Sequence, residues 1–299
     1  MEDKKPGQLY RDAFSTALSQ SVSNRQASVL ALLASIASVD LFFLLFGKNS
    51  ILFPFTDSFA TLLERHPIMF LAGIIVCSAL YVFLKGAVLL SINTVIAKKR
   101  RPTGVILSAA MARFVPYITF EILIILALSV IFLLLGIPGS LSSDNAPLSQ
   151  SLTLLAEIAF IPIFVTLAII ELYGSFYLLF SKVSPKTAFD LGYSLLMRRL
   201  TETATFGGLF LLTFLLFSVT LNVLLPVLQS SLPDTRIRIA VPLTAFYLLQ
   251  AAYFSFSKAA WIAFFRSIAK DEPEAAALQT AENVLEKSVP ELGHEGESA

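Results

Sequence analysis

Four ionisable residues lie within long apolar stretches of the sequence, where a charge is costly and therefore informative. They are Lys85, Glu121, Glu171 and Lys258. A charge at the centre of a bilayer costs about 2.5–3.5 kcal/mol on insertion scales, so such residues usually pair or line a polar cavity. Counted at about 1.5 Å per helical residue, all four fall in the same half of the membrane.

Three interpretations of these charges remain open from the sequence. They form interhelical ion pairs, or they line a polar chamber open to the cytoplasm that holds an ion or an amphiphile headgroup. The third alternative is that the lysines snorkel to the interface. Trp261, close to Lys258, favours this last alternative, because tryptophan marks the headgroup region.

The residue types of common catalytic and metal sites are missing. His66 and His294 are isolated, and the single cysteine, Cys77, lies in an apolar stretch, so the chain lacks the roughly four ligands of a structural zinc site. The sequence contains neither a Gly-x-Ser-x-Gly elbow nor a Walker phosphate loop. It therefore predicts no catalytic, cofactor-binding or metal-binding residues, and a protein that is not an enzyme.

The composition indicates where these residues lie. Of 299 residues, 56% are hydrophobic and 14% are charged, whereas ordinary soluble domains have about 25% charged residues. The net charge of +1 gives no global field that would attract nucleic acid. We therefore expect an all-α, polytopic integral membrane protein.

Six stretches have the roughly 20 mostly apolar residues that a helix needs to cross the hydrocarbon core. These predicted spans are residues 28–46, 67–96, 114–137, 152–180, 203–228 and 239–268. Sixteen basic residues lie on one side of them and four on the other. Because basic segments stay in the cytoplasm, both termini are predicted to be cytoplasmic. Residues 1–270 form the predicted membrane domain, and residues 271–299 form a cytoplasmic tail with eight acidic residues.

Three basic segments that precede the odd-numbered spans look alike. Residues 9–18 and 185–197 have the pattern of amphipathic helices, and residues 102–113 follow a basic loop. We interpret each as an interfacial helix that leads into a helical hairpin, and we predict three repeats of this unit. The alternative is that any protein built from membrane hairpins shows this rhythm. Basic residues in these segments are predicted to contact anionic lipid: Lys98, Lys99, Arg100, Arg101, Arg113, Lys186, Arg198 and Arg199.

Small residues recur at every fourth position in two of the predicted spans, which favours close approach of helices in lipid. Pro162, deep within the fourth span, is the predicted hinge. The small residues are Ala27, Ala31 and Ser35 near the first span, and Ala251, Ser255, Ala259 and Ala263 in the sixth.

The chain from Leu9 to Lys270 resembles a loose group of six-span proteins that includes the membrane region of some bacterial glycerophosphodiester phosphodiesterases. The resemblance rests on basic amphipathic segments, such as residues 187–196 (Thr-Ala-Phe-Asp-Leu-Gly-Tyr-Ser-Leu-Leu), each followed by a span and then a long span rich in small residues. In those enzymes the hydrolytic residues belong to a separate soluble barrel. The resemblance therefore implies fold and membrane residence, and almost nothing about activity.

The leading hypothesis is a non-catalytic membrane protein that acts in membrane organisation or lipid handling. Its expected partners are membrane lipids, and nucleic acid is not among them. The alternative is a carrier or channel for a small molecule or amphiphile, with the buried charges along its pathway. A polar cavity that contains all four charges would favour the carrier, whereas charges packed against one another would favour the first hypothesis.

Overall fold

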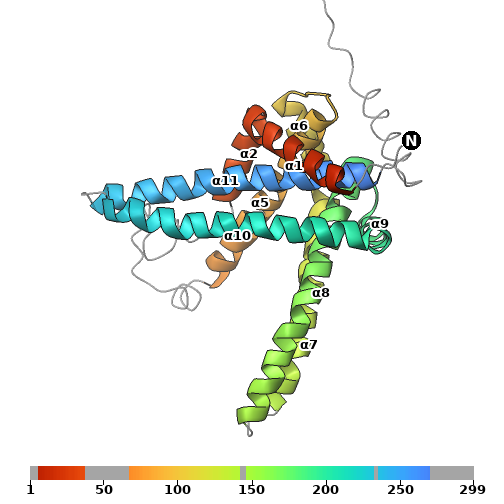
Figure 1. Cartoon of the computed structure of the whole chain (residues 1–299), viewed down its shortest axis with the longest axis vertical. Helices are drawn as coiled ribbons and strands as arrows, with labels where there is room; N and C mark the ends of the chain where they lie inside the picture. The colour runs from red at the N-terminus through yellow and green to blue at the C-terminus, as the bar shows by residue number, and fades with distance from the viewer. Residues whose placement is uncertain (1–5, 38–66, 142–145, 232–234, 270–299) are drawn as a thin grey trace, which may run out of the picture.

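The computed structural model describes residues 6–37, 67–141, 146–231 and 235–269, and all regular secondary structure in these ranges is α-helical. The expected all-α class is thus confirmed. The helices are shown in Figure 1: α1 (Pro6–Ser23), α2 (Arg25–Ile36), α5 (Pro67–Ile96), α6 (Thr103–Ala112), α7 (Phe114–Leu141), α8 (Ala146–Ser181), α9 (Pro185–Arg198), α10 (Leu200–Ser231) and α11 (Thr235–Ile268).

Within the described ranges, four helices are long and apolar enough to cross a membrane. They contain the stretches Leu71–Ile96, Phe114–Leu135, Gln150–Ser181 and Leu200–Leu228. These coincide with the second to fifth predicted spans, which supports a multi-pass membrane protein. Only the beginning of the first predicted span, in α2, belongs to the described chain. The sixth falls on α11, a helix of 34 residues that is not one of the four.

The long helices form hairpins that extend from a common region, where the short helices α1, α6 and α9 pack on long helices. We call this region the hub. Helices α7 and α8 lie side by side, and so do α10 and α11. Figure 1 shows the two hairpins leaving the hub in clearly different directions. With 36 residues, α8 is about 54 Å long, well beyond the roughly 30 Å hydrocarbon core. It continues as a helix through Pro162, the predicted hinge.

The hub is built by short helices that each pack on a long helix of another hairpin. Helix α6 contacts α5, α9 contacts α8, and α1 contacts α11, so the contacts close into a circle. In α1 the predicted apolar stripe makes this contact, with Ala13 and Ala17 buried and the ring of Phe14 tilted against that of Phe256 of α11, their centroids 6.1 Å apart. Parts of the three long helices α5, α8 and α11 are thereby covered by short helices.

Aromatic side chains fill the part of the hub between α10 and α11. The rings of Phe206 and Phe264 stack with centroids 4.2 Å apart, and Trp261 meets Phe206 edge-on at 4.8 Å. Trp261 is only 7% exposed. Its interpretation as a headgroup marker is therefore wrong, because the indole packs in a core of phenylalanines.

Both α2 and α11 contain buried small residues. These two helices pack against each other. Small side chains let helix backbones approach closely, so the packing is expected to be dense at this position. The buried small residues are Ala27, Ala31 and Ser35 of α2, and Ala251, Ser255 and Ala259 of α11.

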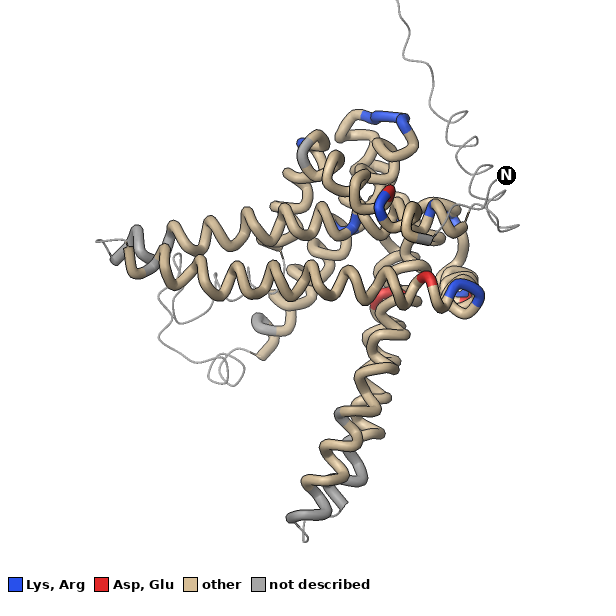
Figure 2. The backbone as a smooth tube through the Cα atoms, in the orientation of Figure 1, with Lys and Arg blue, Asp and Glu red and all other residues tan. Residues whose placement is uncertain are grey.

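Outside the hub, the hairpins expose apolar side chains. Leu133 of α7, Leu155 of α8 and Leu216 of α10 are each between 67% and 69% exposed. The most apolar part of α10 has no buried residue at all. Figure 2 shows that the charged residues of the described chain gather at the hub, while the hairpins are almost free of them. Exposed apolar surfaces of this extent are typical of helices that lie in a membrane.

Candidate functional site

Lys85 of α5 lies between two carboxylates that come from different helices. Its Nζ atom is 2.8 Å from Oε1 of Glu121 in α7 and 2.8 Å from Oε1 of Glu171 in α8. The three side chains are 9%, 12% and 16% exposed, respectively. One ammonium group thus joins the outward helix and the returning helix of the α7–α8 hairpin to α5.

Neighbouring groups hold this cluster in place. The Ser175 hydroxyl, one turn after Glu171, donates a hydrogen bond of 3.1 Å to Oε1 of Glu171. The Lys85 ammonium also lies 5.9 Å from the ring centroid of Tyr117, a distance at which a cation is attracted to the ring face. Gly86 leaves the space that this ring occupies, because a Cβ atom there would be 3.3 Å from it.

Lys258 belongs to the same region without direct contact to the carboxylates. Its ammonium lies 5.6 Å from the ring centroid of Phe254 in the same helix. Among the described residues it has no ion pair within 4 Å, although it is close enough to Glu171 to interact electrostatically. Two bases and two acids therefore balance in charge at the hub. Of the four residues predicted from the sequence, Lys85 contacts Glu121 and Glu171, and Lys258 lies nearby without direct contact.

A close helix contact fixes the position of Glu171. A Cβ atom at Gly192 of α9 would lie 2.9 Å from the carbonyl oxygen of Ile170 and 3.0 Å from the amide nitrogen of Gly174, both in α8. The backbones of α8 and α9 therefore approach each other without intervening side chains. Because Ile170 directly precedes Glu171, this contact holds the backbone next to Glu171 in place, and with it the position of the carboxylate.

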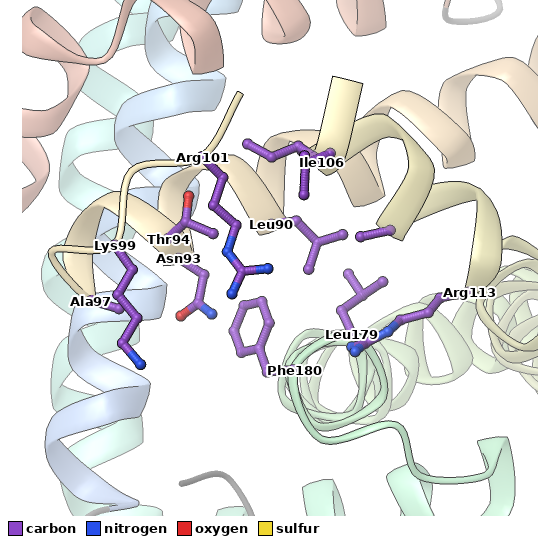
Figure 3. A pocket seen from close by; sticks show the side chains of 12 residues that line it. Leu90, Asn93, Thr94, Ala97, Lys99, Arg101, Ile106, Arg113, Leu179 and Phe180 are labelled. Carbon is purple, nitrogen blue, oxygen red and sulfur yellow. The ribbon is translucent and has the colours of Figure 1, made fainter. Parts of the chain in front are cut away.

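A second polar feature is a pocket of about 70 Å³ between the C-terminal ends of α5 and α8, the loop at residues 97–102, and α6. Figure 3 shows Arg101 and Arg113 reaching into it from opposite sides. Asn93, Thr94 and Lys99 complete its polar lining. None of the four buried charges described above lines this pocket.

The chain turns sharply where α5 leads into the pocket loop. Lys98 has a φ of 58°, in the left-handed region that ordinarily favours glycine. The amide of Lys98 donates to the carbonyl of Val95, and the amide of Lys99 donates to the carbonyl of Thr94. These two bonds define a Schellman motif, which ends the helix and directs residues 99–101 across the pocket.

The predicted lipid-contacting residues occupy different positions around the hub. Arg113 is buried, and its burial lowers the pKa of the guanidinium to about 10, so that it is charged at neutral pH. The Arg198 guanidinium donates to the Ser194 hydroxyl, and Arg199 lies 3.5 Å from Glu202. Five residues of this set are exposed: Lys98, Lys99, Arg100, Lys186 and Arg198.

Two parts of the site have no counterpart in the sequence-based expectations. The pocket itself was not predicted, although the three basic residues that line it, Lys99, Arg101 and Arg113, were predicted to contact anionic lipid. The second is a hydrogen bond of 2.9 Å from Nε of Arg266 in α11 to Oδ1 of Asn93 in α5. Both bring together residues that are far apart in the sequence, and no local pattern signals such a contact.

No protein family, curated protein or solved structure matches the chain. Function must therefore be inferred from the geometry of the hub and the hairpins. In the described ranges no three His, Cys, Asp or Glu side chains are grouped so that they could hold a metal ion.

Proposed function

We propose that this chain is a non-catalytic integral membrane protein that organises lipids around its apolar hairpins. The observation that carries the proposal is the divergence of two long hairpins whose side chains are exposed along their length (Figure 1). Helices that diverge in a bilayer cannot cover one another. They are in contact with lipid on most of their surface, and the lipids between them are held at a fixed site.

The direct ion pairs favour this function over that of a carrier. A carrier needs a continuous polar cavity through which its charges meet the transported species. Here Lys85 touches Glu121 and Glu171 at 2.8 Å, and the ring centroid of Tyr117 lies 5.9 Å from the ammonium. Opposite charges in direct contact neutralise one another, so they hold the helices together and are not free to bind a transported species.

The proposal includes six spans, three repeats and cytoplasmic termini. The circular contacts of α1, α6 and α9 with the three long returning helices support the repeats. The gathering of basic residues at the hub supports its placement at the cytoplasmic surface, since basic segments remain on that side (Figure 2). Kinship with the membrane region of glycerophosphodiester phosphodiesterases is part of the same proposal.

Boundary lipids test the proposed function directly. The protein is reconstituted into vesicles that contain spin-labelled phosphatidylcholine or phosphatidylglycerol, and the motionally restricted fraction of each label is measured. We expect a large restricted fraction, enriched in the anionic lipid because Lys and Arg near the surface each contribute about 1 kcal/mol. A small restricted fraction together with a solute flux that Glu171→Gln abolishes would instead show a carrier.

A further inference from the structure

We propose that the pocket beneath the loop at residues 97–102 binds one phosphate group, carried by an anionic phospholipid. The same chemistry would also suit a free phosphate ion, and the experiment below separates the two sources. The inference rests on the proposed function and deepens it, since it names one specific lipid site among the many boundary contacts.

Arg113 is the residue of the pocket whose surroundings most clearly favour a bound anion. Its side chain is almost entirely enclosed, with the residue 6% exposed, and it lines the pocket. In the part of the chain that the structure describes, its Nη1 atom has no hydrogen-bond partner. A buried charge is strongly unfavourable unless it is paired and hydrogen-bonded. An anion in the pocket would provide the missing partner.

Other arginines of the hub show that Arg113 is unusual. Arg266 donates to Asn93, and Arg198 donates to Ser194. Arg199 lies beside Glu202. Each of these guanidinium groups has a partner from the protein, whereas the most buried one of the four does not.

The surroundings of Arg113 select for negative charge. Arg101 reaches into the pocket from the opposite side, as Figure 3 shows, and Lys99 also lines it. No acidic side chain of the described chain is among the lining residues. Guanidinium groups present a planar fork of N–H donors that matches phosphate oxygens, so two arginines that line one pocket are suited to bind a phosphate there.

The apolar lining favours a lipid as the source of the phosphate. Val105 and Ile106 of α6 and Leu179 of α8 line the pocket together with its polar residues. A volume of about 70 Å³ accommodates several water-sized groups, which is enough for a phosphate. A free ion would make no use of the apolar side chains, whereas the glycerol and first methylenes of a phospholipid would cover them.

Two arginine variants and one matched control test the site. Arg113→Gln and Arg101→Gln each remove a lining guanidinium, while Arg100→Gln removes an exposed neighbour that does not line the pocket. Each purified protein in a mild neutral detergent is titrated with phosphatidylglycerol, phosphatidylcholine or inorganic phosphate, and its melting temperature is recorded. Without added ligand, Arg113→Gln should melt no lower than the unaltered protein, because it removes an unpaired buried charge.

Phosphatidylglycerol should raise the melting temperature of the unaltered protein and of Arg100→Gln. It should bind Arg113→Gln and Arg101→Gln at least about tenfold more weakly, because charge-assisted hydrogen bonds to phosphate are lost. The same shift with inorganic phosphate alone would retain the phosphate site but assign it to the free ion. Equal responses of all variants to phosphatidylglycerol, or no response of the unaltered protein to either anion, would overturn the proposal.

The boundary-lipid measurement distinguishes failure of this site from failure of the proposed function. Arg113→Gln should leave the restricted fraction of phosphatidylcholine label unchanged, because the exposed hairpin surfaces are unaltered. A normal boundary fraction without specific phosphatidylglycerol binding would reject the pocket and leave the lipid-organising function standing.

Discussion

Lys85→Met is expected to destabilise the protein more than any other single substitution in the hub. It leaves Glu121 and Glu171 close together without the ammonium that now contacts both at 2.8 Å. Removing one partner of a buried ion pair typically costs about 3–5 kcal/mol. Unfolding of the purified protein in detergent, followed by loss of helical circular dichroism, measures the difference.

Double-mutant cycles show whether this loss comes from the ion pairs. We expect a coupling free energy above about 1 kcal/mol between Lys85→Met and Glu171→Gln, as for residues in direct contact. The matched cycle of Lys258→Met with Glu171→Gln should give much weaker coupling, because no ion pair within 4 Å joins these residues. Coupling below about 0.5 kcal/mol in the first cycle would show that the charges are hydrated and independent.

Gly192→Ala is expected to separate α8 from α9. The added methyl group would lie 2.9 Å from the carbonyl oxygen of Ile170. Because this is a backbone atom, no side-chain rotation can relieve the clash. Overpacking of this kind typically costs about 1–3 kcal/mol. The same unfolding measurement in detergent gives the value.

Gly208→Ala provides the matched control for this substitution. Gly208 is an exposed residue in α10, and a Cβ atom there would meet nothing within 4 Å. Alanine should stabilise this position by about 0.5–1 kcal/mol, because glycine is unfavourable within a helix. If both substitutions had the same effect, the close approach of α8 and α9 would not be a constraint.

The helices and the buried charges could be predicted from the sequence because both leave local signals. Long apolar runs predicted the positions of the four helices in the described ranges that are long and apolar enough to cross a membrane. The rarity of charge in such runs singled out Lys85, Glu121 and Glu171, which the structure brings into contact. Which lysine would pair was not predictable, since Lys85 and Lys258 are of the same type and are both predicted in the same half of the membrane.

The arrangement of the hairpins and the pocket could not be predicted in this way. Periodicity shows which face of a helix is apolar, but it does not show whether a neighbouring helix or lipid covers that face. Arg113 looked like one more basic residue beside a span, and only the structure shows that it is buried beside a pocket lined by residues of α5 and α8, with no hydrogen-bond partner for its Nη1 atom in the described chain. Trp261 was misassigned for the same reason, because its phenylalanine neighbours come from two helices.

The separation of the hairpins in a bilayer tests the central claim most directly. Spin labels at Leu133 of α7 and Val227 of α10 replace exposed side chains, so they should not disturb packing. Pulsed electron paramagnetic resonance then measures the distance between them in reconstituted vesicles. Diverging hairpins predict a separation far beyond the roughly 8–10 Å between the axes of packed helices. A distribution centred near that contact distance would show that the hairpins close into one bundle, and it would contradict a protein that holds lipid between them.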